Sequence, residues 1–482
     1  MRRSTLAQDR IHVESFSKQR SFPTFTHSYS KCCCHCFPLA LITFLALLQI
    51  GTLIQALKIN PALSFSRVFP TSWPSFPHQA HNIIYSLAKT KLHEPVAFFP
   101  LIDRRFAKTA MDGNTWFMSS LNDTYEEGET EFLHFPSKES DGRLLCLAGS
   151  NPSNGTRNSY ALAPPEALPR NAKVLSGLTF VSDTYYDYDN LWHGLSAAAV
   201  PFASWHRRKE CARPARLVLY HRGELRTRMG PWVATLMKAV FGQEMAIERF
   251  EKSEEGPSCF EEAVVFRHNE GSMARERREK VYDMMRCKAR AYCGISTDVG
   301  GLNAVRLTLL LRRGARSFKD EPAVIRTFGR QCMEVDACQL KVARPNNLTF
   351  CDQVKLLSET DILASPHGAQ LTNMFFMDKN SSLMEFFPKG WQELAGVGQH
   401  VFRWIANYSG MKHQGAWNDP QGDHCPHDDG RRCFSFYKNR QLGYDEAFFA
   451  NWTARVLNEV KEYKAFKRDA QTQLTQSSCQ CS

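Results

Sequence analysis

Residues 361–388 of the chain read DILASPHGAQLTNMFFMDKNSSLMEFFP. The apolar run Asp361–Ser365 predicts a strand, Pro366-His367-Gly368 a turn, and Ala369–Phe376 a helix. Ser382–Phe387 predicts the next strand, which Pro388 ends. Strands that alternate with helices indicate a Rossmann-like parallel sheet, and such sheets bind ligands at the carboxyl ends of their strands.

The flanking sequence continues this alternation. Val305–Leu311 (VRLTLLL) is an almost continuous apolar run, as in a strand covered on both faces. Asp320-Glu321-Pro322 predicts the start of one helix, and Thr349-x-x-Asp352 resembles a capping box ahead of another. Upstream, strand candidates at Leu217–Tyr220 and Ala263–Phe266 flank a helical stretch around Trp232–Val240. The predicted fold class is therefore α/β.

A longer helix is predicted from about Met273 to Tyr292, where apolar residues recur at helical spacing. The other face carries six basic side chains, which are Arg275, Arg277, Arg278, Lys280, Arg286 and Lys288. Glu276 and Glu279 are mixed among them. We interpret this face as solvated rather than as an anion-binding surface.

The turn between the strand at Asp361–Ser365 and its helix presents backbone N–H groups and a positive helix end at the ligand edge of the sheet. Phosphate or pyrophosphate is the ligand that such a turn favours. Arg312 and Arg316 follow a neighbouring strand, and their planar guanidinium groups suit phosphate oxygens. Glu385 lies in an apolar strand, where a carboxylate is costly unless it is paired or meets a ligand such as the hydroxyls of a ribose.

These residues resemble glycosyltransferase family 61. The block from Thr349-Phe350-x-x-Gln353 through Pro388 is similar to that family's HGA-x-L-x-N segment, which precedes an apolar strand with Glu and then Pro. Arg312-x-x-x-Arg316 with Asp320-Glu321 resembles its Arg-x-x-x-Arg and Asn-Glu pattern. Asn190-Leu-Trp-His193 is similar to its Asn-x-x-His motif.

The resemblance implies an inverting transferase with two Rossmann-like lobes, the GT-B arrangement, that moves a sugar from a UDP donor to a glycan or glycoprotein. The implied substrate-binding residues are Asn190, Arg312, Arg316, His367, Gly368, Ala369, Asn373 and Glu385, with the arginines and the His-Gly-Ala turn at the diphosphate and Glu385 at the ribose. The implied donor is a substrate, and no cofactor is expected.

The catalytic base is expected to be His193, because an unperturbed imidazole titrates near neutrality and can take the proton of the acceptor hydroxyl. The chain departs from the family pattern at Ala197, where an Asp is usual. Asp189 or Asp187 of the neighbouring turn is a candidate substitute. Asp187-Tyr188-Asp189 also matches a D-x-D metal motif, but about one such triplet arises by chance in a chain of this length, so we expect no metal.

Two hypotheses for function follow. The first is a transferase, with a UDP-pentose such as UDP-xylose favoured over a UDP-hexose derivative as donor. The second is an inactive luminal protein that binds a nucleotide or glycan, or acts as a scaffold, because Ala197 replaces the usual Asp. Turnover of a UDP-sugar distinguishes the two.

Phe37–Leu57 (FPLALITFLALLQIGTLIQAL) carries no charge. At about 1.5 Å per residue it reaches roughly 32 Å, enough to cross a bilayer core. A cleaved signal peptide is the main alternative, but the preceding region is long and no small-x-small site follows the apolar run. Basic residues ahead of the run predict a cytosolic N-terminus. We therefore expect a single-pass type II protein of the Golgi membrane or endoplasmic reticulum, with a luminal catalytic domain.

Cysteine usage and glycosylation triplets fit this compartment. Cys32, Cys33, Cys34 and Cys36 crowd the cytosolic membrane edge, where palmitoylation is a plausible use. The twelve cysteines beyond the membrane segment are an even set, as expected of disulfides in an oxidising lumen. Six asparagines begin N-x-[ST] triplets, which are Asn122, Asn154, Asn347, Asn380, Asn407 and Asn451.

The 482 residues, 43% apolar and 23% charged, leave room for two or three packed units. We expect a cytosolic tail (1–36), a transmembrane signal anchor (37–57), a stem (58–94), an acceptor domain (95–300) and a nucleotide-sugar domain (301–482). Part of the net charge of +11 lies in residues 1–36, and the remainder is too diffuse to indicate a nucleic-acid partner. The expected partners are the UDP-sugar, its acceptor and the membrane.

Overall fold

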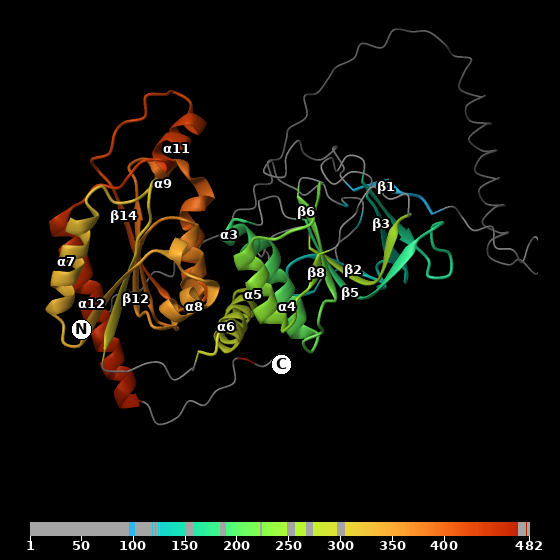
Figure 1. Cartoon of the computed structure of the whole chain (residues 1–482), viewed down its shortest axis with the longest axis horizontal. Coiled ribbons are helices and arrows are strands. Elements are labelled where there is room, and N and C mark those ends of the chain that lie inside the picture. The colour runs from blue at the N-terminus through green and yellow to red at the C-terminus, as the bar shows by residue number, and fades with distance from the viewer. Residues whose placement is uncertain are drawn as a thin grey trace, which may run out of the picture. The chain divides into compact units, whose positions relative to one another are not determined.

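The computed structural model (Figure 1) describes residues 96–101, 118, 121, 124, 126–149, 158–183, 189–221, 224–247, 256–266, 273–295, 304–470 and 479. All of them belong to one compact unit, Leu92–Ser482. The predicted membrane segment Phe37–Leu57 and the cysteine cluster before it lie outside the described residues. Within the described ranges, no helix is both long and apolar enough to cross a membrane.

The first sheet is mixed, with strand order β1-β4-β3-β9-β5-β6-β7, and with β2 paired to β9 and β8 to β6. The strands are β1 (Phe99–Pro100), β2 (Phe132–Phe135), β3 (Leu144–Ala148), β4 (Ser159–Ala163), β5 (Lys173–Asp183), β6 (Arg216–His221), β7 (Glu224–Arg226), β8 (Ala246–Ile247) and β9 (Ser258–Phe266). The central strands β9, β5, β6 and β8 are parallel, and the outer pairings are antiparallel.

The second sheet is entirely parallel, with order β11-β10-β12-β13-β14. Its strands are β10 (Val305–Leu310), β11 (Cys338–Ala343), β12 (Ile362–Pro366), β13 (Ser382–Phe387) and β14 (Lys412–Asn418). Every residue of β12 and β13 is buried, as expected of strands covered on both faces. The predicted α/β class and the parallel sheet are therefore confirmed.

The helices are α3 (Leu191–Gly194), η3 (Leu195–Ala199), α4 (Val200–Arg208), α5 (Pro231–Phe241), α6 (Arg275–Tyr292), α7 (Glu321–Met333), η5 (Pro345–Asn347), α8 (Phe350–Ser358), η6 (Ala369–Phe376), α9 (Trp391–Leu394), η7 (Gly396–His400), α10 (Val401–Tyr408), α11 (Gly430–Lys438) and α12 (Glu446–Ala470). Asp320 caps α7, and Thr349 with Asp352 forms the predicted capping box of α8. The segment Ala369–Phe376 is a 3₁₀ helix rather than the expected α-helix.

Helices cover both faces of the parallel sheet. Alternate residues of β10, such as Leu307 and Leu309, pack with α7 and α12, whereas Leu310 belongs to the core formed with α8, η6 and α10. Figure 1 shows α7 and α12 on one side of the strands and α8 on the other. The second of these cores continues through α4, α5 and α6 to the first sheet.

The interpretation of the basic face of α6 as solvated is wrong for Arg278 and Arg286, which are 5% and 7% exposed. Arg286 donates to the carbonyl oxygens of Phe375, at the end of η6, and Ser409, just after α10. Arg290, also buried, donates to the Phe376 carbonyl. These arginines satisfy carbonyls that helix ends leave without partners, which explains why the charges are buried.

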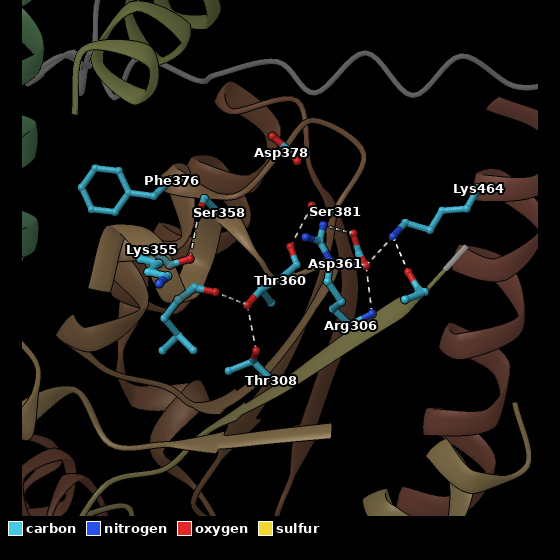
Figure 2. A network of polar contacts seen from close by, with 12 residues as sticks. Arg306, Thr308, Lys355, Ser358, Thr360, Asp361, Phe376, Asp378, Ser381 and Lys464 are labelled. Carbon is cyan, nitrogen blue, oxygen red and sulfur yellow. Dashed lines mark hydrogen bonds and ion pairs between the residues drawn. The ribbon is translucent and has the colours of Figure 1, made fainter. Parts of the chain in front are cut away.

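A buried ionic network lies at the amino end of the parallel sheet (Figure 2). Asp361 accepts hydrogen bonds from Arg306 at 2.9 and 3.0 Å and from Lys464 of α12 at 2.6 Å. Beside it, Thr308 and Thr360 bond at 2.7 Å. This cluster fastens α12 to β10 and β12 at the edge opposite the expected ligand edge, so it is structural.

Disulfides pair most cysteines of this unit. The described bridges are Cys146–Cys259, Cys287–Cys479, Cys293–Cys351, Cys332–Cys338 and Cys425–Cys433, and Cys211 is also disulfide-bonded. The four described triplet asparagines, Asn347, Asn380, Asn407 and Asn451, are all exposed, as glycan attachment requires.

Candidate functional site

The parallel sheet reverses its strand order at β10. The chain passes from β10 to β11 on one side and then to β12 on the other, so the topological switch point lies between β10 and β12. The loop Arg312–Arg316 follows β10, and the turn Pro366–Gly368 follows β12. Ligands of open α/β sheets bind at this position. We call these two segments the switch-point edge.

Two guanidinium groups converge on one carbonyl at the switch-point edge. Arg316 donates to the His367 carbonyl oxygen at 3.0 Å, and Arg312 donates to the same oxygen at 3.4 Å. Among the described residues, neither arginine forms an ion pair with a carboxylate, and the Nε of each is buried without a partner. The edge therefore concentrates positive charge that no acidic side chain of the described unit balances.

Burial, and to a smaller extent the neighbouring Arg312, lower the pKa of Arg316 to about 10. Burial also lowers the pKa of Arg312. Both shifts mean that this environment opposes the charged forms, so a bound anion would be strongly favoured. Arg316 also has a left-handed backbone (φ 61°), held where its N–H donates to the Arg440 carbonyl at 2.7 Å. Such strain in a non-glycine residue is common at functional sites.

Gly368 allows this close approach. A Cβ atom at this position would lie 2.4 Å from an Arg312 guanidinium nitrogen and 2.5 Å from Oε1 of Gln370. Its φ of 162° is ordinary extended backbone, so space rather than backbone conformation requires the glycine. Ala369 then begins η6, and Gln370 donates to the Pro366 carbonyl at 2.8 Å, which fixes the turn.

His367 is 6% exposed and lies among aromatic rings. Its ring centroid is 4.3 Å from Trp391, 4.7 Å from Phe387 and 4.9 Å from Phe402. Nδ1 lies 2.5 Å from Oε1 of Glu385. Burial, the largest effect, and the two nearby arginines lower the pKa of His367 against the opposing influence of Glu385.

Glu385 requires a correction. Its side chain is fully buried, and its second oxygen accepts from Nε2 of His413 at 2.8 Å. Burial alone would raise its pKa, but the two imidazoles outweigh burial and lower it, so the carboxylate stays ionised. Because the carboxylate is fully buried and already paired with two histidines, it is not open to the hydroxyls of a ribose, and the implied ribose-binding role does not fit this placement.

Asn373 also requires a correction. It is 1% exposed and accepts from Trp232 Nε1 at 2.7 Å, while its Nδ2 donates to Gln353 at 2.8 Å and to the Gln370 carbonyl at 3.2 Å. These three partners occupy the amide. Asn373 therefore joins α5, α8 and η6 and does not face a ligand.

The Asn-x-x-His segment forms the start of a helix. Asn190 caps α3 by accepting from the Trp192 N–H at 3.1 Å, and His193 is half-buried within α3. Helix α3 contacts η6, so His193 and the His367 turn belong to neighbouring elements. Asp189 is exposed just before the cap, and Asp187 lies outside the described residues. Ala197 lies in the π-helical turn η3, a feature often found at functional sites.

Three residues of this site were missed from the sequence, namely His413, Trp391 and Gln370. His413 lies on β14, whose short polar sequence KHQGAWN has no strong strand pattern. Trp391 begins the short helix α9 after Gly390, where an aromatic residue has no motif around it. The one sequence signal for these residues is Glu385 itself, because a carboxylate in an otherwise apolar strand needs a partner.

Fold and site together define an α/β protein with two arginines gathered at the switch-point edge of a parallel sheet. Residues 169–384 match the model of the family described as Glycosyltransferase 61, which supports the family resemblance of this region. No curated protein matches the chain. Among solved structures, an oxidoreductase from Corynebacterium diphtheriae aligns at 12% identity and a TM-score of 0.23, over 34% of this chain and 98% of that chain, which is too weak a likeness to support an argument.

The match contains Asn190, His193, Arg312, Arg316 and the His367 turn. It ends one residue before Glu385 and well before His413. The match supports a glycosyltransferase, a class of enzyme that in general takes a nucleotide-sugar donor and a glycan acceptor.

Proposed function

We propose that the chain is an inverting glycosyltransferase of the GT-B arrangement, which transfers a sugar, with a pentose such as xylose favoured, from a UDP donor to a glycan or glycoprotein. The donor diphosphate binds at the switch-point edge. The acceptor binds on the side of α3. We expect no metal or cofactor to be required.

The observation that supports this most strongly is the pair Arg312 and Arg316. Both guanidiniums point to the His367 carbonyl at the β10–β12 switch point, without a carboxylate partner among the described residues. A diphosphate would supply the missing counter-charge. Because negative charge on the diphosphate grows as the bond to the sugar breaks, the two guanidiniums would stabilise the transition state more than the bound donor.

The other chemical requirement is a base for the acceptor hydroxyl. His193 is our candidate, with Asp189, just before the cap of the same helix, as its partner in catalysis. Its position on α3, against η6, supports this assignment. Loss of the usual Asp at Ala197 supports the second hypothesis, an inactive nucleotide- or glycan-binding scaffold of the same fold.

We further propose a type II orientation in the Golgi membrane or endoplasmic reticulum, with the unit Leu92–Ser482 in the lumen. The exposed triplet asparagines and the disulfides are consistent with a secretory compartment. Protease treatment of sealed microsomes would leave this unit intact if the orientation is right, and would digest it if the unit faces the cytosol.

The functional test uses the purified full-length chain, a panel of UDP-sugars and defined acceptors. Arg316→Gln and Arg312→Gln should each weaken UDP binding by about ten- to a hundredfold, since hydrogen bonds to charged groups contribute about 1.5–3 kcal/mol. Arg313→Gln is the matched control, because Arg313 is an exposed arginine of the same loop. Transfer by the parent supports the enzyme, and UDP binding without turnover supports the scaffold. Equal UDP affinity in all three variants would exclude the switch-point edge as the donor site.

A further inference from the structure

Three side chains from three consecutive elements of the parallel sheet form one hydrogen-bonded chain. His367 follows β12, Glu385 lies on β13, and His413 lies on β14. Glu385 accepts at Oε1 from His367 Nδ1, 2.5 Å away, and at Oε2 from His413 Nε2, 2.8 Å away. We call these residues the His-Glu-His relay.

The hydrogen bonds determine where the protons of the relay lie. The Gly415 N–H donates to Nδ1 of His413 at 3.3 Å, so this nitrogen carries a lone pair and the His413 proton is on Nε2, directed at Glu385. An ionised carboxylate can only accept, so the His367 proton toward Glu385 is on Nδ1. The remaining nitrogen of His367, Nε2, is hydrogen-bonded to no described residue and is not among the fully buried unpartnered polar atoms.

We propose that Glu385 and His413 are positioning residues for His367, holding its ring so that Nε2 meets the donor diphosphate and, once protonated from solvent, donates a hydrogen bond to a phosphate oxygen. This inference rests on the proposed function. It assigns roles to two residues beyond the family match, and it replaces the ribose role implied for Glu385. The backbone carbonyl of His367, which Arg312 and Arg316 share, ties the same residue to the switch-point edge.

The charges that face His367 favour proton uptake only when an anion is present. Arg312 and Arg316, from the loop after β10, oppose an imidazolium, whereas Glu385 of β13 favours it. The side chains of Phe387, Trp391 and Phe402 around the ring carry no charge. A bound diphosphate would neutralise the arginines, and the Glu385 carboxylate would then stabilise the protonated ring.

Glu385→Gln gives the sharpest test, because glutamine keeps the shape of the side chain. If its carbonyl oxygen still accepts from His413, its amide must donate to Nδ1 of His367, so the His367 proton must move to Nε2. Nitrogen-15 shifts of histidine in the unliganded full-length chain report this tautomer. We expect Nδ1–H in the parent and Nε2–H in Glu385→Gln. The Nε2–H tautomer in the parent, or no change in the variant, would overturn the inference.

The role of His413 is tested with His413→Ala, the conservative His413→Gln, which retains a donor for Glu385, and His134→Ala as control. His134 bonds a carboxylate, Glu262, at 3.2 Å in the other sheet. Titration with UDP and with inorganic pyrophosphate, in buffers of different ionisation enthalpy, measures affinity and proton uptake. We expect His413→Ala to bind both ligands about tenfold more weakly with less proton uptake, His413→Gln to recover most of both, and His134→Ala to match the parent.

The outcomes separate this inference from the proposed function. If Glu385→Gln shows the expected tautomer change but the parent binds neither UDP nor pyrophosphate, the relay stands and the donor site is wrong. If the parent binds UDP but His413→Ala behaves as His134→Ala does, the donor site stands and the positioning role of His413 is wrong. Thermal melts show whether a His413 variant fails to fold. In that case the histidine tautomer in Glu385→Gln remains the test of the inference.

Discussion

Nε1 of Trp232 donates a hydrogen bond of 2.7 Å to Oδ1 of Asn373, and both side chains are buried. The bond joins α5, beside the first sheet, to η6, which directly follows the His367 turn. Trp232 also packs edge-on against Phe350 of α8 and Phe375 of η6. The element that carries the His-Gly-Ala turn is thus supported by residues from distant parts of the chain.

Trp232→Phe should therefore destabilise the fold. It keeps an aromatic ring but leaves Oδ1 of Asn373 buried without a donor, which should lower the free energy of unfolding by about 1–3 kcal/mol. Urea unfolding followed by circular dichroism measures this. Trp404→Phe is the control, because Trp404 is 37% exposed. Equal midpoints for both variants would show that the hydrogen bond contributes nothing.

Gly368→Ala should impair UDP binding without unfolding the protein. The added methyl group would meet the flexible ends of Arg312 and Gln370, which can move, and the backbone is already extended. Displacing one charged donor should weaken binding by about tenfold or more. Gly398→Ala is the control, because a Cβ there meets no atom within 4 Å. A well-folded Gly368→Ala chain with parental affinity would contradict the proposed role of this turn.

Asp361→Ala should lower stability strongly, because it leaves Arg306 and Lys464, whose side chains are only 14% and 13% exposed, without their carboxylate. Breaking a buried ion pair from one side costs about 3–5 kcal/mol. Asp336→Ala removes the exposed pair that Lys461 of the same helix forms at 3.3 Å, and it should cost less than about 1 kcal/mol. Differential scanning calorimetry of both variants compares them. If both variants lose a similar, small amount of stability, the network in Figure 2 does not contribute to the packing of α12 against the sheet.

Acid should destabilise the protein through His206. Burial lowers the pKa of His206 from 6.5 to about 4, with Lys288 and Arg213 acting in the same direction and the hydrogen bond to the Ala212 carbonyl opposing them. The unfolded chain therefore binds a proton that the folded chain excludes, so stability falls as the pH drops from 6.5 toward 4. His206→Asn keeps a donor for the Ala212 carbonyl but cannot titrate.

Melting temperatures between pH 4 and pH 7.5 test this directly. The His206→Asn variant should lose less stability than the parent over that interval, whereas His427→Asn, at an exposed histidine, should follow the parent. If the melting temperatures of the parent and of His206→Asn fall by the same amount with pH, groups other than His206 cause the acid sensitivity.

The sequence predicts the elements around the switch-point edge well, because their signals are local. Apolar runs predict the strands β10, β12 and β13. The capping pair of Thr349 and Asp352 predicts the start of α8. The surroundings of Asn373 and Glu385 do not follow from the sequence, because their hydrogen-bond partners are distant along the chain. Trp232 is 141 positions from Asn373, and His413 is 28 positions from Glu385 on a strand with little apolar pattern. A polar residue in an apolar segment indicates that a hydrogen-bond partner must exist, but the sequence does not show which residue that partner is.

The bridge between Cys287 of α6 and Cys479 closes a covalent ring of the chain. All five strands of the parallel sheet, the arginines of the switch-point edge and the His-Glu-His relay lie between these two cysteines. One peptide-bond cut by a protease anywhere inside the ring therefore releases no fragment until the bridge is reduced. Such a nicked chain would run as a single species on a non-reducing gel, and both halves of its donor site would remain tethered to α6.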